Sequence, residues 1–341
     1  MVAVGPGTAS LSADSEGISD TQTLHVVEGL PLAFPLEGKL NVDFFYTAYV
    51  DHAPGGGAID YHCGEKTYAG HQGTDLALLD FAHMDEGVFV QAAAAGTVTT
   101  VHDGAYDRNT EWGTRGFGNY VALDHGDGFE TLYAHLKRDS IPVRVGDTVG
   151  VGDVLGEVGS SGWSDHPHLH FEVRQGDRFI DPFTGACGSA VALWRQPDSY
   201  QETFALLNSG LSRQDLTLDT VKQPPAQTDT VAVNQRMTLW VQLANIAPEM
   251  VSEWRMIGPD GKLAAEYAHS HTLVAGVSWW WAWFFPGEEG AWRMDFYHDG
   301  RLLASHSFEA VASQTVGAPP LAPGTKGAVI GMAGGVEREL R

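Results

Sequence analysis

The chain has 341 residues, of which 43% are hydrophobic, enough for one large domain or two smaller ones with a packed core. Its formal net charge of −23 argues against nucleic-acid binding, because that function needs basic surfaces. We also expect no membrane span, since no apolar run approaches the roughly 20 residues that one requires.

The first half of the chain predicts a β-rich domain behind a short leader. Residues 1–25 are rich in Ser, Thr, Gly and Asp, which predicts a flexible N-terminal leader. In residues 26–190, short apolar runs alternate with Gly, Asp and Pro, a pattern typical of antiparallel β-structure. Within them, "GNYVALDHGDGFETLYAHL" has alternating segments on either side of "HGDG", which predicts a hairpin.

The second half predicts a further β domain after a linker. Residues 191–227 contain "SYQETFALLNSGLSRQDL", which we interpret as a short helix, followed by the linker "KQPPAQTDT". Residues 228–312 contain strands joined by the turns "GPDGK" and "HDGR", as in an immunoglobulin-like (Ig-like) β-sandwich. The Pro/Gly-rich residues 313–341 predict a disordered tail.

The segment "VSWWWAWFF" is the most aromatic part of the second domain. It could bind a glycan or another protein from the surface of the sandwich. Its alternation instead favours one set of rings in the sandwich core and the other set covering an interdomain contact.

The two cysteines, Cys63 and Cys187, are either buried thiols or one disulfide. Each lies beside a glycine, in a loop context that favours the disulfide. A cross-link over so long a loop stabilises a protein by about 4–5 kcal/mol in the chain-entropy model. It also implies an oxidising compartment. The N-terminus carries no signal peptide, so either the chain is cytoplasmic or a signal peptide has been removed. We expect the second, and a secreted or periplasmic protein.

Four histidines and one aspartate in the first domain have spacings that suit a single metal site. His71 and Asp75 would lie about 13 Å apart on a regular strand, so a turn at Gly73 must bring them together. His168 and His170 lie on one face of a predicted strand in "PHLHFEVR", about 6.6 Å apart. His135 ends a hairpin strand and can converge on them. Each histidine alone would more often be structural or surface-exposed, so the pattern by itself suits a zinc site and such separate roles equally well.

The motifs "GHQGTD", "YAHL" and "HPHLHFEV", in that order, resemble the lysostaphin-like (LytM, M23) family of zinc endopeptidases. The resemblance covers residues 60–185, the core of a predicted M23-type peptidase domain at 26–190. It implies a mainly β peptidase fold of antiparallel sheet, followed here by the Ig-like domain. It also implies hydrolysis of peptide bonds in bacterial peptidoglycan, in cross-links or stem peptides, by a zinc-activated water.

The resemblance further implies a role for each residue of the motifs. His71, Asp75 and His170 would be ligands of one Zn²⁺ ion, and His135 and His168 the catalytic pair. Three protein ligands and one open position are typical of catalytic rather than structural zinc. Either histidine can take a proton or stabilise the oxyanion.

The neighbouring residues allow less specific predictions. Asn119 and Tyr133 could line a substrate cleft, although turn and core roles explain them equally well, and Tyr68 could donate to the tetrahedral intermediate. Glu172 shares the strand face of the ligands and is better explained as a support behind them.

Two other functions compete with the peptidase. A non-catalytic LytM-type regulator that binds and activates a cell-wall amidase would usually lack one or more ligands, and here every motif position is intact. A swinging-arm carrier domain, suggested by "VGDTVGVGDVLGEVGSSG", would display a lysine at a turn, and this segment contains none.

Overall fold

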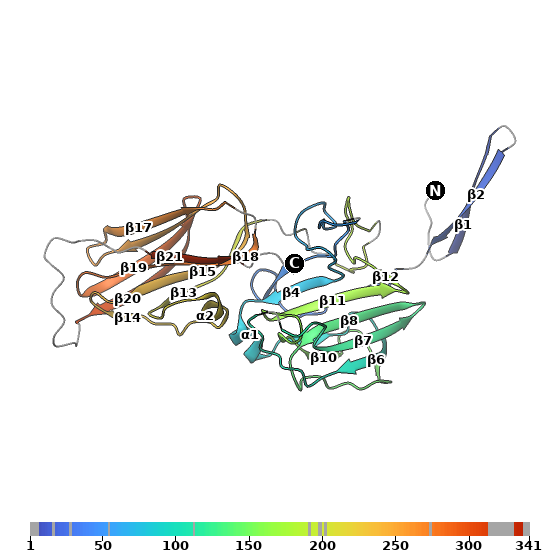
Figure 1. Ribbon diagram of the computed structural model, residues 1–341, viewed down its shortest axis with the longest axis horizontal. Helices are drawn as coiled ribbons and strands as arrows, with labels where there is room; N and C mark the ends of the chain where they lie inside the picture. The colour runs from blue at the N-terminus through green and yellow to red at the C-terminus, as the bar shows by residue number, and fades with distance from the viewer. Residues whose placement is uncertain are drawn as a thin grey trace.

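Two β-rich bodies lie side by side in the computed structural model, with a hairpin projecting from the first (Figure 1). The structure describes residues 7–15, 18–26, 29–53, 55–111, 113–189, 192–196, 200, 203–272, 275–312 and 331–336. The hairpin consists of β1 (Gly7–Ser15) and β2 (Ile18–Val26), within the segment predicted as a flexible leader. Alternation of Ser and Thr with apolar residues suits such a hairpin, whereas overall composition suggested only a polar segment.

The first body is built on an eight-stranded sheet, in the order β3-β4-β11-β8-β7-β6-β9 with β12 beside β11. Its strands are β3 (Phe44–Ala48), β4 (Thr74–Leu78), β6 (Gly96–His102), β7 (Asn119–Gly126), β8 (Phe129–Leu136), β9 (Thr148–Val149), β11 (His168–Gln175) and β12 (Arg178–Phe179). A second small sheet pairs β5 (Phe89–Gln91) with β10 (Val154–Glu157), and α1 (Phe81–Glu86) follows β4. The pairing is antiparallel throughout these strands, as predicted.

One face of the large sheet is buried in an apolar core. Leu169, Phe171 and Val173, the alternating apolar residues of β11, all belong to it. The predicted hairpin is formed by β7 and β8, and its turn contains Asp127 and Gly128, both with positive φ. Because the apolar side of β11 is packed, the residues between its members must face the other side of the sheet.

The second body has two sheets, in the orders β13-β15-β18-β21 and β14-β20-β19-β16-β17. Their strands are β13 (Ala205–Ser212), β14 (Thr230–Ala232), β15 (Met237–Ile246), β16 (Val251–Ile257), β17 (Leu263–Ser270), β18 (Ala275–Phe284), β19 (Gly290–His298), β20 (Arg301–Val311) and β21 (Gly331–Val336). One buried apolar cluster takes residues from both sheets, including Trp280 and Trp254. Whether this body is an immunoglobulin-like sandwich stays a prediction, as do the predicted domain boundaries.

Two predictions for this half of the chain were wrong in part. The segment predicted as a helix contains β13 instead, which pairs with β15, so tertiary pairing overrides the helix preference of its Ala and Leu residues. The helix lies further on, at α2 (Leu218–Lys222). Most of the tail predicted as disordered lies outside the described residues, but β21 pairs with the otherwise unpaired edge of β18.

The aromatic strand β18 joins the two bodies. Trp280 and Phe284 face the core between the two sheets, whereas Trp279 and Trp281 belong to a separate cluster that includes Phe45 of β3. This is the arrangement that the alternation predicts. The rings of Trp279, Trp280, Trp281 and Phe284 are therefore buried, and Trp283 is partly buried, so this strand offers little aromatic surface to a glycan or another protein. Any contact of the second body with an outside partner stays a prediction.

Among the described residues, neither helix is long and apolar enough to cross a membrane.

Candidate metal centre

The polar face of β11 meets β4 where the two strands pair. His170 lies directly opposite Asp75, and His168 lies opposite Ala77. Directly opposed residues of neighbouring strands point to the same face with their Cβ atoms close together. The register therefore brings His168, His170 and Asp75 together, and the small side chain of Ala77 leaves room beside His168.

His71 reaches the same place from the loop before β4. Its backbone carbonyl accepts from Asp51 N at 2.8 Å, and its Nδ1 donates to Tyr49 O at 2.7 Å. Because the proton of the ring is on Nδ1 and is donated to Tyr49 O, the lone pair is on Nε2. This atom faces Asp75 and His170.

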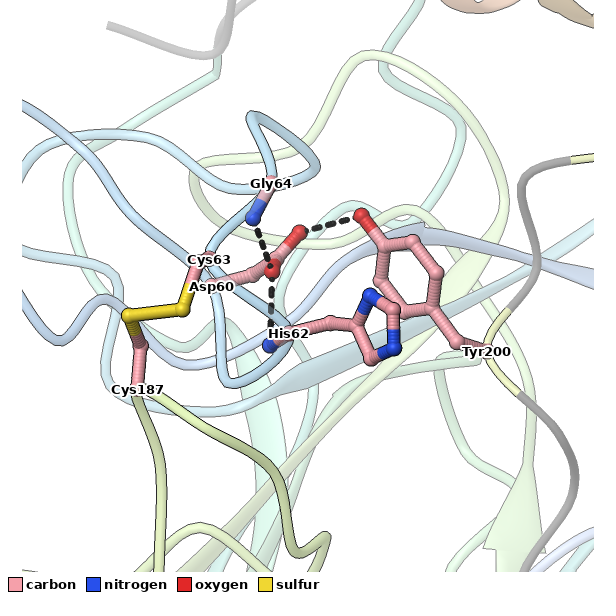
Figure 2. The surroundings of a disulfide bond; sticks show 6 residues. All are labelled: Asp60, His62, Cys63, Gly64, Cys187 and Tyr200. Carbon is pink, nitrogen blue, oxygen red and sulfur yellow. Dashed lines mark hydrogen bonds between the residues drawn. A yellow bond between two sulfur atoms is a disulfide. The ribbon is translucent and has the colours of Figure 1, made fainter.

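The loop that leads to His71 is tied down by a disulfide and a buried carboxylate (Figure 2). The predicted Cys63–Cys187 bond is confirmed. Asp60, which is fully buried, accepts from the amides of His62 and Gly64 and from the Tyr200 hydroxyl. These bonds hold a segment without regular secondary structure in one conformation, which fixes the approach to His71.

Gly73 serves this loop through its small size rather than through an unusual backbone angle. A Cβ at this position would lie 2.7 Å from Phe171 O and 2.8 Å from the His170 ring. Its φ is not in the positive region, so the expectation that it supplies conformational freedom was wrong. The segment can pass close to β11 only because residue 73 has no side chain.

The three ligand-type groups form a compact, buried set. His71, Asp75 and His170 are the one group of this kind found in the described part of the chain. His71 Nε2 lies 3.2 Å from Asp75 Oδ1 and 3.2 Å from His170 Nδ1, and His170 Nδ1 lies 2.7 Å from Asp75 Oδ1. A tetrahedral zinc ion bound at 2.0–2.1 Å separates its ligand atoms by roughly 3.3 Å. Donor types and spacing therefore fit zinc.

Glu172 lies behind His170 and orients its ring. Its Oε1 accepts from His170 Nε2 at 2.9 Å, so the Nδ1 atom of that ring is the one turned toward His71 and Asp75. The carboxylate is buried and also accepts from Arg174 Nε at 2.8 Å. A carboxylate on the far nitrogen of a ligand imidazole fixes its tautomer and strengthens it as a ligand.

The charges of this group are strongly coupled. Burial alone would lower the pKa of His170, but Asp75 and Glu172 outweigh burial and raise it to about 10. Burial would likewise raise the pKa of Asp75, yet the neighbouring imidazoles hold it well below its usual range. The pocket therefore favours a positive charge beside an ionised carboxylate, which is what a bound cation would supply.

His135 reaches the site because the end of β8 changes direction. By alternation it would face the core with Tyr133, but its φ of 62° is in the left-handed region and breaks the strand pattern. Its Nδ1 donates to Ser161 O at 2.7 Å, and its ring lies 4.7 Å from that of His168. Burial, then His168 and His170, lower the pKa of His135 well below its usual range.

His168 is arranged in the same way. Its Nδ1 donates to His166 O at 2.8 Å, and its Nε2 lies 3.9 Å from Asp75 Oδ1. In both His135 and His168, a backbone carbonyl thus takes the Nδ1 proton and leaves an Nε2 lone pair on the neutral ring.

The three residues predicted to line the substrate cleft differ in placement. The Tyr68 ring stacks on His71, 4.3 Å between centroids, so it borders the group. Asn119 is buried, and its amide bonds to the backbone of Ala105 and Leu136, which is a structural role. Tyr133 packs in the core and its hydroxyl accepts from Ala93 N, because it faces the opposite side of the sheet from His170. For Asn119 and Tyr133 the cleft prediction was therefore wrong.

The groups that orient His135 and His168 were not predicted. They are the backbone carbonyls of Ser161 and His166, and a carbonyl is present at every residue. Residue type therefore carries no signal for this role. Phe117 was also missed, although its ring lies 5.9 Å from that of His170.

Known proteins are similar in sequence to the part of the chain that carries His71, Asp75 and His170. The sequence pattern of peptidase family M23 matches residues 69–182. The DD-carboxypeptidase/endopeptidase Mpg of Neisseria meningitidis is 35% identical over 120 residues, which cover 35% of this chain and 24% of that protein. The lipoprotein NlpD/LppB homolog of Pseudomonas aeruginosa is 38% identical over 93 residues, 27% of each chain.

The chain thus spans about a quarter of the length of these curated relatives. Among solved structures, the catalytic domain of the antimicrobial peptidase lysostaphin from Staphylococcus simulans aligns with 26% identity and a TM-score of 0.28. The alignment covers 42% of this chain and 90% of that one.

Proposed function

Because the chain contains a peptidase family M23 domain at residues 69–182, we propose that it is a zinc-dependent metalloendopeptidase acting on bacterial cell-wall peptidoglycan. It would hydrolyse peptide bonds in the cross-links or stem peptides. One observation carries the proposal: three buried ligand-type groups converge, and two further imidazoles adjoin them. Two imidazoles and one carboxylate, with a position left for water or substrate, are a donor set typical of catalytic zinc.

His71, Asp75 and His170 would hold one Zn²⁺ ion. When bound, such an ion polarises a peptide carbonyl and lowers the pKa of water toward neutrality. Each of the neighbouring residues His135 and His168 has an Nε2 lone pair that can accept the proton of the attacking water. Once protonated, the same ring can donate to the developing oxyanion or to the leaving amine.

Tyr68 is a third candidate for stabilising the oxyanion. Burial, followed by the charges of Asp75 and Glu172, raises its pKa above the usual range of a tyrosine. Its hydroxyl therefore keeps its proton near neutral pH and stays a hydrogen-bond donor beside the metal group.

We further propose that the protein acts outside the cytoplasm, in the periplasm or as a secreted protein. The disulfide supports this location, because such bonds persist in oxidising compartments. Peptidoglycan lies in the same compartments, so location and substrate agree.

The alternative is a non-catalytic regulator that binds and activates a cell-wall amidase. The intact ligand set favours catalysis, since a regulator has no need to keep three buried ligands and two oriented imidazoles together.

A digest of purified peptidoglycan by the zinc-loaded chain, with mass analysis of the products, tests the proposal. We expect defined muropeptides whose masses identify the cleaved bond. His168→Ala should abolish their release while keeping the metal, and chelator treatment should abolish it reversibly. A fully zinc-loaded protein that releases nothing from any wall preparation would refute the peptidase and favour the regulator.

A further inference from the structure

Lys222, the last residue of α2, is a buried cation that reaches the segment in front of β11. Its side chain is only 5% exposed, and its Nζ lies 2.8 Å from Asp165 Oδ2 and 3.1 Å from Asp165 O. The same ammonium lies 5.9 Å from the centre of the Trp279 ring of β18. A buried charge is tolerated only when paired, so this contact holds the second body to Asp165.

His166, which follows Asp165 in the chain, lies between the two bodies. Its Nε2 donates to Leu78 O of β4 at 2.8 Å, and its ring lies 5.4 Å from that of Trp279. The following residue, Pro167, accepts from Leu78 N at 2.9 Å. Segment 165–167 is therefore held by β4 on one side and by Lys222 and Trp279 of the second body on the other.

This segment sets the orientation of His168. His166 O accepts the Nδ1 proton of His168, and it also accepts from the Ser164 hydroxyl at 2.9 Å. If the carbonyl moved, His168 Nδ1 would keep only its longer contact with Ser164 Oγ, at 3.2 Å, and Ser164 is itself bonded to that carbonyl. The ring would then no longer be held with Nε2 unprotonated and directed toward Asp75. A displacement of about 1 Å in a catalytic group can lower a rate by up to about 100-fold.

We infer that the second body is a working part of the peptidase, in which Lys222 and Trp279 position His168 through the carbonyl of His166. This inference rests on the proposed peptidase function, since it treats His168 as a group that acts on substrate. Lys222 and Trp279 are positioning residues, because neither touches the metal ligands and both act through segment 165–167.

The test compares the zinc-loaded full-length wild type with Lys222→Met. We expect kcat on peptidoglycan fragments to fall about tenfold, with KM changed less than about twofold, because orientation rather than substrate binding is lost. Nitrogen-15 NMR of the histidine rings supplies a readout independent of activity, with His168 assigned from the spectrum of His168→Gln. In the wild type the Nδ1 proton of His168 should be protected and the ring a single tautomer. In Lys222→Met the proton should exchange and the tautomers mix.

Three further variants guard against a simple loss of stability. Lys222→Met removes the cation beside the Asp165 carboxylate, so the double variant with Asp165→Asn removes both charges and should give the same two changes. Lys222→Arg should restore a large part of kcat and of the protected proton, since it keeps a donor cation. Gln223→Ala removes the neighbouring contact to Arg108 at the same interface, and should change neither readout.

The outcomes separate this inference from the proposed function. An unchanged His168 signal in both the single and the double variant would overturn the positioning role, even in an active peptidase. A lost signal in a chain that cleaves no wall preparation would support the positioning role and count against the peptidase. Equal effects from Gln223→Ala would also overturn it, because any loosening of the interface would then suffice.

Discussion

His170 is held between two carboxylates, and each of them has a separate task. Asp75 faces its Nδ1 at 2.7 Å and belongs to the ligand set, whereas Glu172 faces its Nε2 at 2.9 Å and belongs to the same strand. Arg174 in turn neutralises Glu172 from the far side. As a ligand of the proposed metal ion, His170 would thus have its basicity and direction set by Glu172, which lies on its far nitrogen.

Glu172→Gln should weaken zinc binding by about 10–100-fold, because an amide orients the ring without strengthening it as a ligand. Competition with a chromophoric chelator measures the affinity. Glu130→Gln is the matched control, since Glu130 also lies beside Arg174, at 3.5 Å, but does not touch His170. Equal affinity of Glu172→Gln and wild type would contradict the assigned role.

His166 should make the chain sensitive to acid. Burial, and then the charge of Lys222, lower its pKa to about 3. An unfolded histidine titrates near 6.5, so the unfolded chain binds the proton first as pH falls. The contribution of His166 to the free energy of unfolding is thus complete above pH ~6.5. It decreases by roughly 1.4 kcal/mol per pH unit between there and pH ~3.

His166→Gln removes this titration and keeps an amide donor for Leu78 O. We expect the unfolding free energy of the variant to decrease less steeply than that of wild type between about pH 6 and pH 4. Urea denaturation of chelator-treated protein measures it without a contribution from metal loss. Parallel pH profiles of the two proteins would show that His166 is not the titrating group.

At the scale of elements, the strand that carries His168 and His170 was predictable because its alternation is strict. Leu169, Phe171 and Val173 alternate along β11 and are buried in the apolar core, so its two histidines had to share the other face. His135 shows the limit of such reasoning. Its place in the site depends on a positive φ at the end of β8, and a periodic pattern contains no information on one unusual backbone angle.

The segment that the sequence predicted as a short helix was harder to predict, for a similar reason. β13 is a strand because β15 lies beside it, which is a long-range fact. α2 begins at a Thr217–Thr220 capping box, whereas the usual signal has Glu or Gln at the second position. Local propensity therefore predicted a short helix in this part of the chain, but at residues other than those of α2.

The aromatic strand β18 allows a comparison of its two faces. Trp280→Ala should destabilise the second body by about 3–5 kcal/mol, since it opens a cavity between the two sheets. Trp281→Ala should leave that core intact and loosen the contact between the bodies. Calorimetry should show a lowered transition for Trp280→Ala. For Trp281→Ala, calorimetry should show two separated transitions. Limited proteolysis should cut the linker of this variant faster than that of the wild type.

The same thermogram from both variants would contradict this division of the strand. Trp283→Ala serves as a control for size, because its ring is only partly buried against the interdomain cluster. Its effect on the separation of transitions should be smaller than that of Trp281→Ala.

At the scale of the whole molecule, the site depends on segments far apart in the chain. The loop of His71, the strand of His170 and the helix of Lys222 are brought together by contacts that no single segment encodes. The family motifs predicted the group of His71, Asp75 and His170 that the structure brings together. The contacts from the second body could not be predicted in this way, because no motif describes them. The disulfide also joins two distant parts of the chain, since its cysteines are 124 positions apart in the sequence.

That cross-link should contribute to stability mainly through the unfolded chain. Closing a loop of this length lowers the entropy of the unfolded state by the equivalent of about 5 kcal/mol at 25 °C. The double variant Cys63→Ser with Cys187→Ser should therefore lose about 4–5 kcal/mol of unfolding free energy. Zinc affinity should also fall, because Cys63 anchors the loop that leads to His71.

Tyr200→Phe separates the covalent link from the local hydrogen bonds. It removes only the hydroxyl that donates to Asp60, so it should cost about 1 kcal/mol and leave the disulfide in place. Urea denaturation of oxidised wild type and the two variants gives the comparison, with intact mass confirming the state of the thiols. If the serine variant lost no more stability than Tyr200→Phe, the loop would be held by the Asp60 network rather than by the cross-link. If it lost several times more, the constraint on the unfolded chain would be the larger effect.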